Sequence, residues 1–167
     1  MATPPATRQE EGAALALDDQ PGHLIRRAHQ IAVSVFHSTM GGGITPVQYA
    51  ILKCLRARPG IDQVTLAQEV ALDTSSAALT AARLEAKGWI ARERAPQRQR
   101  RLLLTAQGQG MLERIDARMP EMQQTLLGGF SAHDSREFLR LLRHFTATHN
   151  AMSRAPHRPQ AQAQAQA

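Results

Sequence analysis

The sequence predicts a mainly α-helical (α+β) fold: a winged helix-turn-helix between N- and C-terminal dimerisation helices. Three observations support this fold class. Apolar residues recur at helical spacing along most of the chain, and residues 73–105 run from a small-residue helix into an arginine-rich hairpin. The net charge is +6 and the sequence pI is about 10.9. Such a charge favours a polyanionic partner, either nucleic acid or an anionic membrane surface.

The 167-residue chain is long enough for one domain with a core of its own. We expect this domain over residues 19–152, with disordered tails at 1–18 and 153–167, because both ends lack an apolar period and the second ends in a Gln-Ala repeat. The chain contains no apolar run of the roughly 20 residues that span a bilayer and no signal-like start. A cytoplasmic protein without a membrane partner is therefore expected.

Residues 19–40 predict the first helix, in which Leu24, Ile31 and Val35 recur at helical spacing. The apolar stripe spreads over two adjoining faces, more than one small domain can cover. We therefore expect this helix to take part in a homodimer contact. The three glycines at 41–43 end it.

Thr45 and Pro46 predict the start of the second helix, as N-cap and first helical residue. The segment 61–73 is short and apolar on one side, as the first helix of a helix-turn-helix would be. Its N-cap is expected near Asp62 or Thr65.

The following helix is the candidate recognition helix. Asp73 or Thr74 caps it, and its first turn carries small or hydroxylated residues that include Ser75 and Ser76. Such side chains let a helix N-terminus approach a groove and donate hydrogen bonds to phosphates or base edges. The alternative is that they only cap the helix.

Leu79 and Leu84 are expected to pack the recognition helix on the core, and Gly88 to end it. Residues 90–95 and 100–104 predict the two strands of a hairpin. Five arginines lie in it: Arg92, Arg94, Arg98, Arg100 and Arg101. This density exceeds what solubility requires and indicates contact with a nucleic-acid backbone, although a solvated basic hairpin is the alternative.

Beyond Thr105, apolar residues at steps of four, four, three and four predict a long helix, which Pro120 should kink or interrupt. Ser131 and Asp134 resemble a capping box that starts a final helix. So small a chain offers no second core for two long helices. They are expected to pack with the first helix of a partner chain.

Four short motifs follow one another in a fixed order: Gly43-Ile44-Thr45-Pro46-Val47-Gln48-Tyr49-Ala50-Ile51-Leu52, then Leu66-Ala67 with Leu72-Asp73, then Arg83-Leu84-Glu85-Ala86-Lys87-Gly88-Trp89-Ile90, and Leu104-Thr105-Ala106-Gln107-Gly108. With them, the chain resembles the MarR family of dimeric transcriptional regulators over residues 20–152. The wing departs from the family pattern, since Pro96-Gln97-Arg98 stands where an Asp-Arg-Arg sequence is usual, and Arg98 lacks its acidic partner.

The resemblance implies a homodimeric regulator, not an enzyme and without a cofactor, that places two recognition helices in successive major grooves of palindromic double-stranded operator DNA. It also implies a repressor that a ligand releases by changing the spacing of those helices. We assign DNA contacts to Thr65, Thr74, Ser75, Ser76, Arg83, Arg98 and Arg100.

His23, Arg26 and His29 lie three residues apart, roughly on one side of the first helix. A buried arginine beside imidazoles suits a small planar carboxylate, which a guanidinium binds through two parallel hydrogen bonds. The segment is also similar to regulators of nicotinate catabolism. We therefore expect an aromatic or heteroaromatic carboxylate effector bound by Arg26, His29 and Tyr49, the alternative being a dimer salt bridge at Arg26 and an interface histidine at His29.

Other functions fit the sequence less well. Zinc sensing is suggested by seven histidines, but the chain has one cysteine and no HxxxH pair, so no metal ligands are assigned. An oxidant sensor would need an accessible Cys54, which sits among apolar residues. An architectural DNA-binding protein would share the basic wing but bind without sequence preference. No catalytic constellation or phosphate-binding glycine loop is present.

Overall fold

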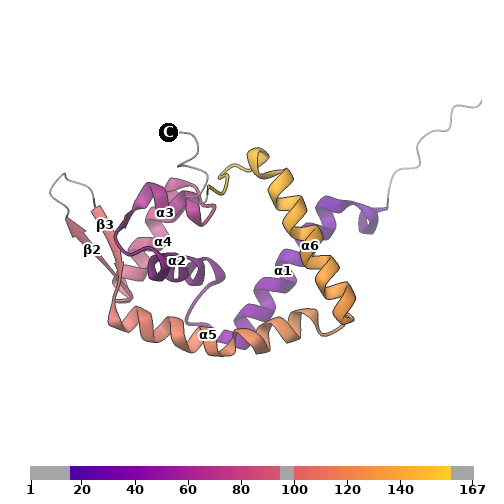
Figure 1. The fold of residues 1–167 in the computed structure, drawn as a ribbon, viewed down its shortest axis with the longest axis horizontal. Coiled ribbons are helices and arrows are strands. Elements are labelled where there is room, and N and C mark those ends of the chain that lie inside the picture. Colours follow the sequence, from indigo (N-terminus) through magenta and orange to yellow (C-terminus); the bar gives the residue numbers. More distant parts are fainter. Residues whose placement is uncertain (1–15, 95–99, 159–167) are drawn as a thin grey trace, which may run out of the picture.

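The computed structural model describes residues 16–94 and 100–158, and Figure 1 shows their arrangement. In chain order the elements are η1 (Leu17–Asp19), α1 (Pro21–Met40), α2 (Pro46–Ala57), β1 (Ile61–Asp62), α3 (Gln63–Glu69), α4 (Thr74–Ala86), β2 (Ile90–Arg94), β3 (Arg100–Leu104), α5 (Ala106–Leu127), α6 (Ala132–Thr148) and η2 (Asn150–Met152). One lobe holds α2, α3, α4 and the β2–β3 hairpin. The helices α1 and α6 lie on the other side, and α5 runs along both (Figure 1).

Side-chain caps define where the helices begin. Thr45 forms a full capping box with Gln48, and Ser131 caps α6, as expected. At the two positions where the sequence left a choice, Asp62 caps α3 and Asp73 caps α4. A carboxylate at these positions satisfies backbone N–H groups of the first turn that have no partner within the helix.

The three strands form an antiparallel sheet in the order β1-β3-β2. In the backbone register, Arg101 on the central strand lies opposite Asp62 of β1 and Glu93 of β2. The hairpin closes with Arg94 opposite Arg100. The strand β2 is described as far as Arg94, and Ala95, its expected last residue, lies outside the described residues. The wing tip, with Arg98, lies outside the described residues.

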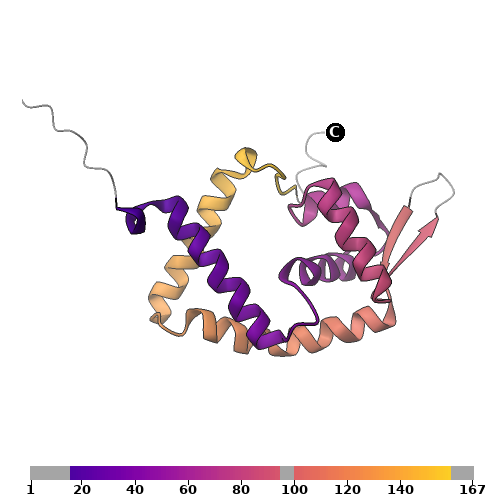
Figure 2. The same cartoon turned by 180° about the vertical axis from the view of Figure 1, so that it is seen from behind.

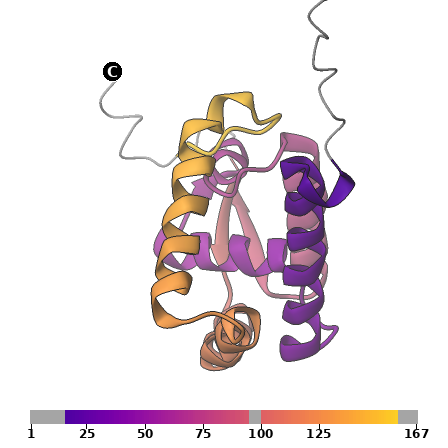
Figure 3. The same ribbon diagram turned by 90° about the vertical axis from the view of Figure 1, so that its right-hand side faces the viewer.

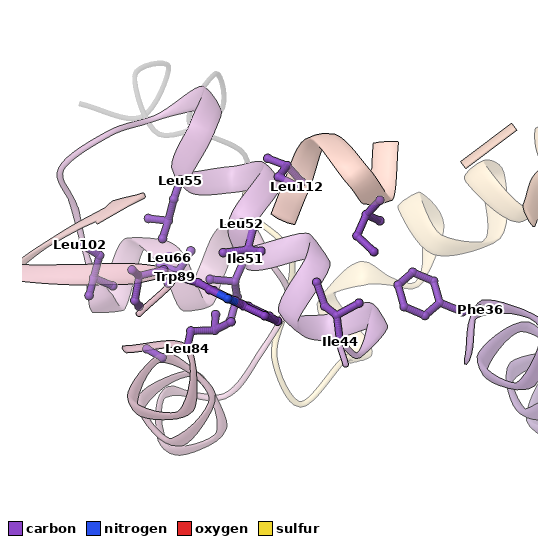
Figure 4. Packing of buried hydrophobic residues seen from close by; sticks show 13 residues of the cluster. Phe36, Ile44, Ile51, Leu52, Leu55, Leu66, Leu84, Trp89, Leu102 and Leu112 are labelled. Carbon is purple, nitrogen blue, oxygen red and sulfur yellow. The ribbon is translucent and has the colours of Figure 1, made fainter. Parts of the chain in front are cut away.

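The core lies in the lobe around α2 (Figure 4). Its largest fully buried side chains are Ile44, Ile51, Leu52, Leu55, Leu66, Leu84, Leu102 and Leu112. Leu84 is buried as expected, but Leu79 is 56% exposed. The expectation for Leu79 was wrong because α4 packs through Ala77, Ala81 and Leu84, and a residue two positions after Ala77 points away from that face.

The junction of the wing with α5 explains why the sequence carries Thr105 and two glycines there. Thr105 caps α5 by accepting from Gly108 N, and its hydroxyl donates to Gly88 O at 2.6 Å. Gly88 has a φ of 71°, which glycine adopts without strain. A Cβ on Gly108 would lie 2.0 Å from Trp89 O, so the backbones meet more closely than any other residue allows.

The long helix α5 continues through Pro120 to Leu127, so a restart at this proline does not occur. Before Pro120, the buried side chains of Leu112 and Ile115 pack α5 against the core of the lobe. The second half of α5 leaves the lobe and leads to α6.

The helices α1 and α6 lie away from the lobe. They cross in the view of Figure 2, but Figure 3 shows them apart, one on each side of α5. Only Phe36 and Thr39, near the end of α1, are buried in that helix, and α6 buries none of its residues. In α6, Leu142 and Phe145 remain 42% and 45% exposed. A single chain therefore leaves much of the apolar surface of both helices uncovered.

The chain does not leave the molecule directly after α6. Residues 153–158, which the sequence predicts as part of a tail, run back to α3, where Arg158 N donates to Gln68 O at 3.1 Å (Figure 1). Residues 1–15 and 159–167, the remainder of the expected tails, lie outside the described residues.

Candidate nucleic-acid interface

The N-terminal turn of α4 is free to meet a ligand. Asp73 accepts a 2.9 Å hydrogen bond from Ser76 N, which fixes the start of the helix. Thr74 and Ser75 are exposed, and Ser76 is half-buried. The hydroxyl groups of Thr74 and Ser75 thus stand at the positive end of the helix dipole, where phosphate oxygens bind favourably.

One face of α4 continues this surface along the helix. Ser75, Leu79 and Arg83 follow at four-residue spacing and are all exposed. They offer a hydroxyl, two methyl groups and a guanidinium. A thymine methyl group and the acceptors of guanine are the major-groove features that such groups recognise. Leu79 was missed as a site residue because leucine in an amphipathic pattern predicts core, and only the packing of α4 shows it outside.

The other expected DNA contacts are Thr65, Arg98 and Arg100. Thr65 is half-buried and donates its hydroxyl hydrogen to Asp62 at 2.6 Å, so only its oxygen lone pairs remain for a further bond. The backbone of Arg100 closes the hairpin opposite Arg94. Arg98 lies in the wing tip, outside the described residues.

Two basic side chains make contacts at the C-terminal end of α4. Arg92 Nε in β2 lies 3.0 Å from a carboxylate oxygen of Glu85 in α4. Lys87 donates to Gly43 O at 2.6 Å and stands over the Trp89 ring at 4.5 Å from its centroid. The wing and the turn after α1 therefore both contact the C-terminal end of the recognition helix.

Asp116 of α5 joins the lobe to the long helices. It accepts from Tyr49 at 2.9 Å and from Lys53 at 3.3 Å, and it pairs with Arg56 at 2.8 Å. Burial opposes ionisation of Asp116, but these three α2 side chains outweigh burial and lower its pKa. Burial and the bond to Asp116 raise the pKa of Tyr49 to about 12. Tyr49, an expected ligand contact, thus has its hydroxyl engaged with Asp116.

Arg26 and His29 of α1 are exposed in the single chain, which contradicts the expectation of a buried arginine. Arg26 donates to Gln30 at 2.9 Å and lies 3.4 Å from His23 Nδ1. Burial of these side chains would need a second chain, because α1 is uncovered on this side.

A cavity of about 520 Å³ lies between α2, α3 and the C-terminal segment. Tyr49, Lys53, Cys54 and Arg58 are among its lining residues, whereas Arg26 and His29 are not. The structure therefore separates Tyr49 from the other two expected ligand contacts. Burial raises the pKa of the Cys54 thiol, which lowers the fraction of reactive thiolate.

Two further features bear on the class of protein. Within residues 16–94 and 100–158, no three His, Cys, Asp or Glu side chains are grouped so that they could hold a metal ion. In the same part of the chain, no helix has the length and hydrophobicity that a bilayer crossing requires.

A capped helix pair with an exposed recognition face, followed by a basic wing, defines a DNA-binding protein of the winged helix-turn-helix class. The sequence model of the MarR family matches residues 44–102. The transcriptional regulator HosA of Escherichia coli O157:H7 is 31% identical over 102 residues, which cover 60% of this chain and 76% of HosA. The chain belongs to the MarR family, as its motifs indicate.

Solved structures agree with this assignment. The PcaV transcriptional regulator of Streptomyces coelicolor, in complex with its natural ligand, is 34% identical and superposes with a TM-score of 0.75 over 81% of this chain and 97% of PcaV. BpsR of Bordetella bronchiseptica, whose DNA binding is regulated by 6-hydroxynicotinic acid, is 25% identical with a TM-score of 0.75 over 80% of this chain and 98% of BpsR. These relatives are transcriptional regulators rather than enzymes.

Proposed function

We propose that the protein is a homodimeric repressor that binds a palindromic operator through α4 and is released by a small aromatic or heteroaromatic carboxylate. The observation that carries the DNA contact is the exposed face of α4 with Ser75, Leu79 and Arg83. On this face, the uncharged side chains suit contacts with base edges. The backbone contacts are assigned to the remaining expected residues: Thr65, Thr74, Ser76, Arg98 and Arg100. A wing on each side would reach toward the flanking minor groove.

A second copy of the chain is the proposed occupant of the uncovered faces of α1 and α6. Both helices carry exposed leucine, isoleucine or phenylalanine side chains, which a soluble chain buries when a partner is available. The β2–β3 hairpin lies at the other end of the molecule from α1 and α6 (Figure 1). A two-fold dimer presents two α4 helices, which matches a palindromic operator.

The effector is proposed from the chemistry of α1. Arg26 is exposed, and within the described residues no carboxylate lies within 4.0 Å of its guanidinium. The Arg26 guanidinium can therefore bind a ligand carboxylate through two hydrogen bonds. His29 lies about one turn further along the helix. The regulated relatives PcaV and BpsR support a small-molecule effector, and the 6-hydroxynicotinic acid that regulates BpsR is itself a heteroaromatic carboxylate.

The experiment uses a labelled duplex that the protein has selected from a random-sequence pool. Aromatic and heteroaromatic carboxylates are screened by thermal shift, and those that stabilise the protein are added to the complex while its fluorescence anisotropy is followed. Wild-type protein should release the duplex. Arg26→Ala should bind DNA normally but fail to respond, whereas Arg27→Ala, which removes an arginine paired with Asp18 at 3.2 Å, should respond as the wild type does. An unchanged response of Arg26→Ala would contradict the assigned effector site.

A further inference from the structure

The C-terminal segment after α6 is held in place by its own hydrogen bonds. Asn150 Nδ2 donates to His157 O at 2.9 Å, and His157 N donates to Asn150 Oδ1 at 2.8 Å. These two bonds close residues 150–157 into a loop. The bond from Arg158 N to Gln68 O then attaches the end of the loop to α3.

This attachment brings the segment to the beginning of the recognition helix. A hollow of about 300 Å³ separates it from α3 and from the turn into α4. Its lining includes Val64 and Gln68 of α3, Asp73 and Thr74 at the start of α4, and Arg154 and Arg158 of the segment. The two arginines thus stand beside the helix end that is expected to meet DNA.

The charges of the segment point to its partner. Arg154 and Arg158 are both exposed, and within the described residues neither has a carboxylate within 4.0 Å of its guanidinium nitrogens. Asp73, the acid in the same hollow, is engaged with Ser76 N. A segment that blocked the recognition helix would be expected to imitate the negative charge of DNA. This one carries the opposite sign, which strengthens attraction to phosphate.

From these observations we infer that residues 150–158 form part of the DNA-binding surface, with Arg154 and Arg158 contacting backbone phosphates next to the groove that α4 enters. The inference rests on DNA binding through α4. Such contacts position the protein on the duplex and add affinity without reading sequence. The C-terminal segment would then be a second basic element of the interface besides the wing, placed next to the uncharged start of α4.

The salt dependence of DNA binding tests this inference. The full chain, the double variant Arg154→Ala/Arg158→Ala and the control Arg114→Ala/Arg118→Ala are titrated against the same selected duplex at several salt concentrations. The control removes the same charge from the exposed side of α5. Each phosphate contact contributes about 0.9 to the steepness of log K against log salt, and the double variant removes two arginines from each chain of the dimer. The slope should therefore become shallower by roughly 3.6, and the control should leave it unchanged.

The same series separates the other outcomes. An unchanged slope in the double variant would overturn the inference, and a gain in affinity would show that the segment competes with DNA. Asn150→Ala, which opens the loop but keeps both charges, should lower the slope less than the double variant does. A wild-type chain that binds no duplex from the pool would overturn the proposed function together with this inference, so the two failures are distinguishable.

Discussion

The hydroxyl of Tyr49 in α2 donates a 2.9 Å hydrogen bond to Asp116 in α5, 67 positions further along the chain. Lys53 and Arg56 reach the same carboxylate. The contact ties the helix at the centre of the lobe to the helix that leads away to α6. A movement of the lobe relative to this part of α5 would therefore break the contacts of the cluster.

Ionisation of Tyr49 reports on the contact directly, because it is the single tyrosine of the chain. Burial and Asp116 raise the pKa of Tyr49 to about 12. The ultraviolet absorbance of tyrosinate should thus appear at higher pH in the folded protein than in denaturant. Asp116→Asn should move the midpoint down toward 10.0, the ordinary value, and a midpoint that does not move would show that the hydrogen bond is absent in solution.

Acid stability offers a second test of the same cluster. The folded-state pKa of Asp116 lies below 3.8, its ordinary value, so the carboxylate stabilises the fold above that pH and loses this contribution as the pH falls through the lowered pKa. Urea titrations should show wild type more stable than Asp116→Asn at neutral pH. The difference should shrink below about pH 4. A difference that stays constant to the lowest pH would contradict the assignment.

The close approach of Gly108 to Trp89 predicts that even an alanine at position 108 destabilises the fold. Gly108→Ala places a methyl group 2.0 Å from Trp89 O, and the rigid backbone there cannot yield. We expect a loss of about 1–3 kcal/mol in the free energy of unfolding, measured by denaturant titration. The control is Gly110→Ala, two residues along α5, where a Cβ meets no atom within 4 Å. It should be neutral or stabilising, since alanine favours helix over glycine by up to about 1 kcal/mol.

The uncovered face of α6 predicts how the oligomer can be broken. Leu142→Asp puts a charge among the exposed apolar residues of this helix and should yield a chain of about 18.3 kDa in light scattering instead of a dimer. Arg136→Asp changes an exposed residue of α6 that is six positions earlier and about 120° around the helix from Leu142, and it should leave the dimer intact. Dimers of both variants would show that α6 lies outside the interface.

Local sequence signals predicted much of the fold because caps, glycines and apolar periods act over a few residues. Thr45, Gly88 and Ser131 mark element ends in the structure as they do in the sequence. Leu79 could not be placed this way, since the side of α4 that packs is chosen by Ala77 and Ala81 together with the neighbouring helices. A packing contact lined by alanines gives only a weak hydrophobic pattern in the sequence.

Features that depend on distant residues were harder to predict. The cluster at Asp116 joins residues 67 and 63 positions apart, which no local pattern reveals. Arg26 was expected to be buried, but burial of α1 depends on a second chain. The segment 153–158 has the composition of a tail, and only the bonds of Asn150 to His157 show why it turns back to α3.

Sequence-specific binding by two recognition helices is the central claim, and a competition experiment tests it most directly. The complex with the selected duplex is challenged with the same duplex carrying one scrambled half-site and with bulk genomic DNA. We expect two chains per duplex and competition by bulk DNA only at roughly a thousandfold or greater excess, the margin usual for specific sites. If the scrambled duplex and bulk DNA both competed as well as the unlabelled selected duplex does, the result would contradict the account and identify a protein that binds DNA without sequence preference.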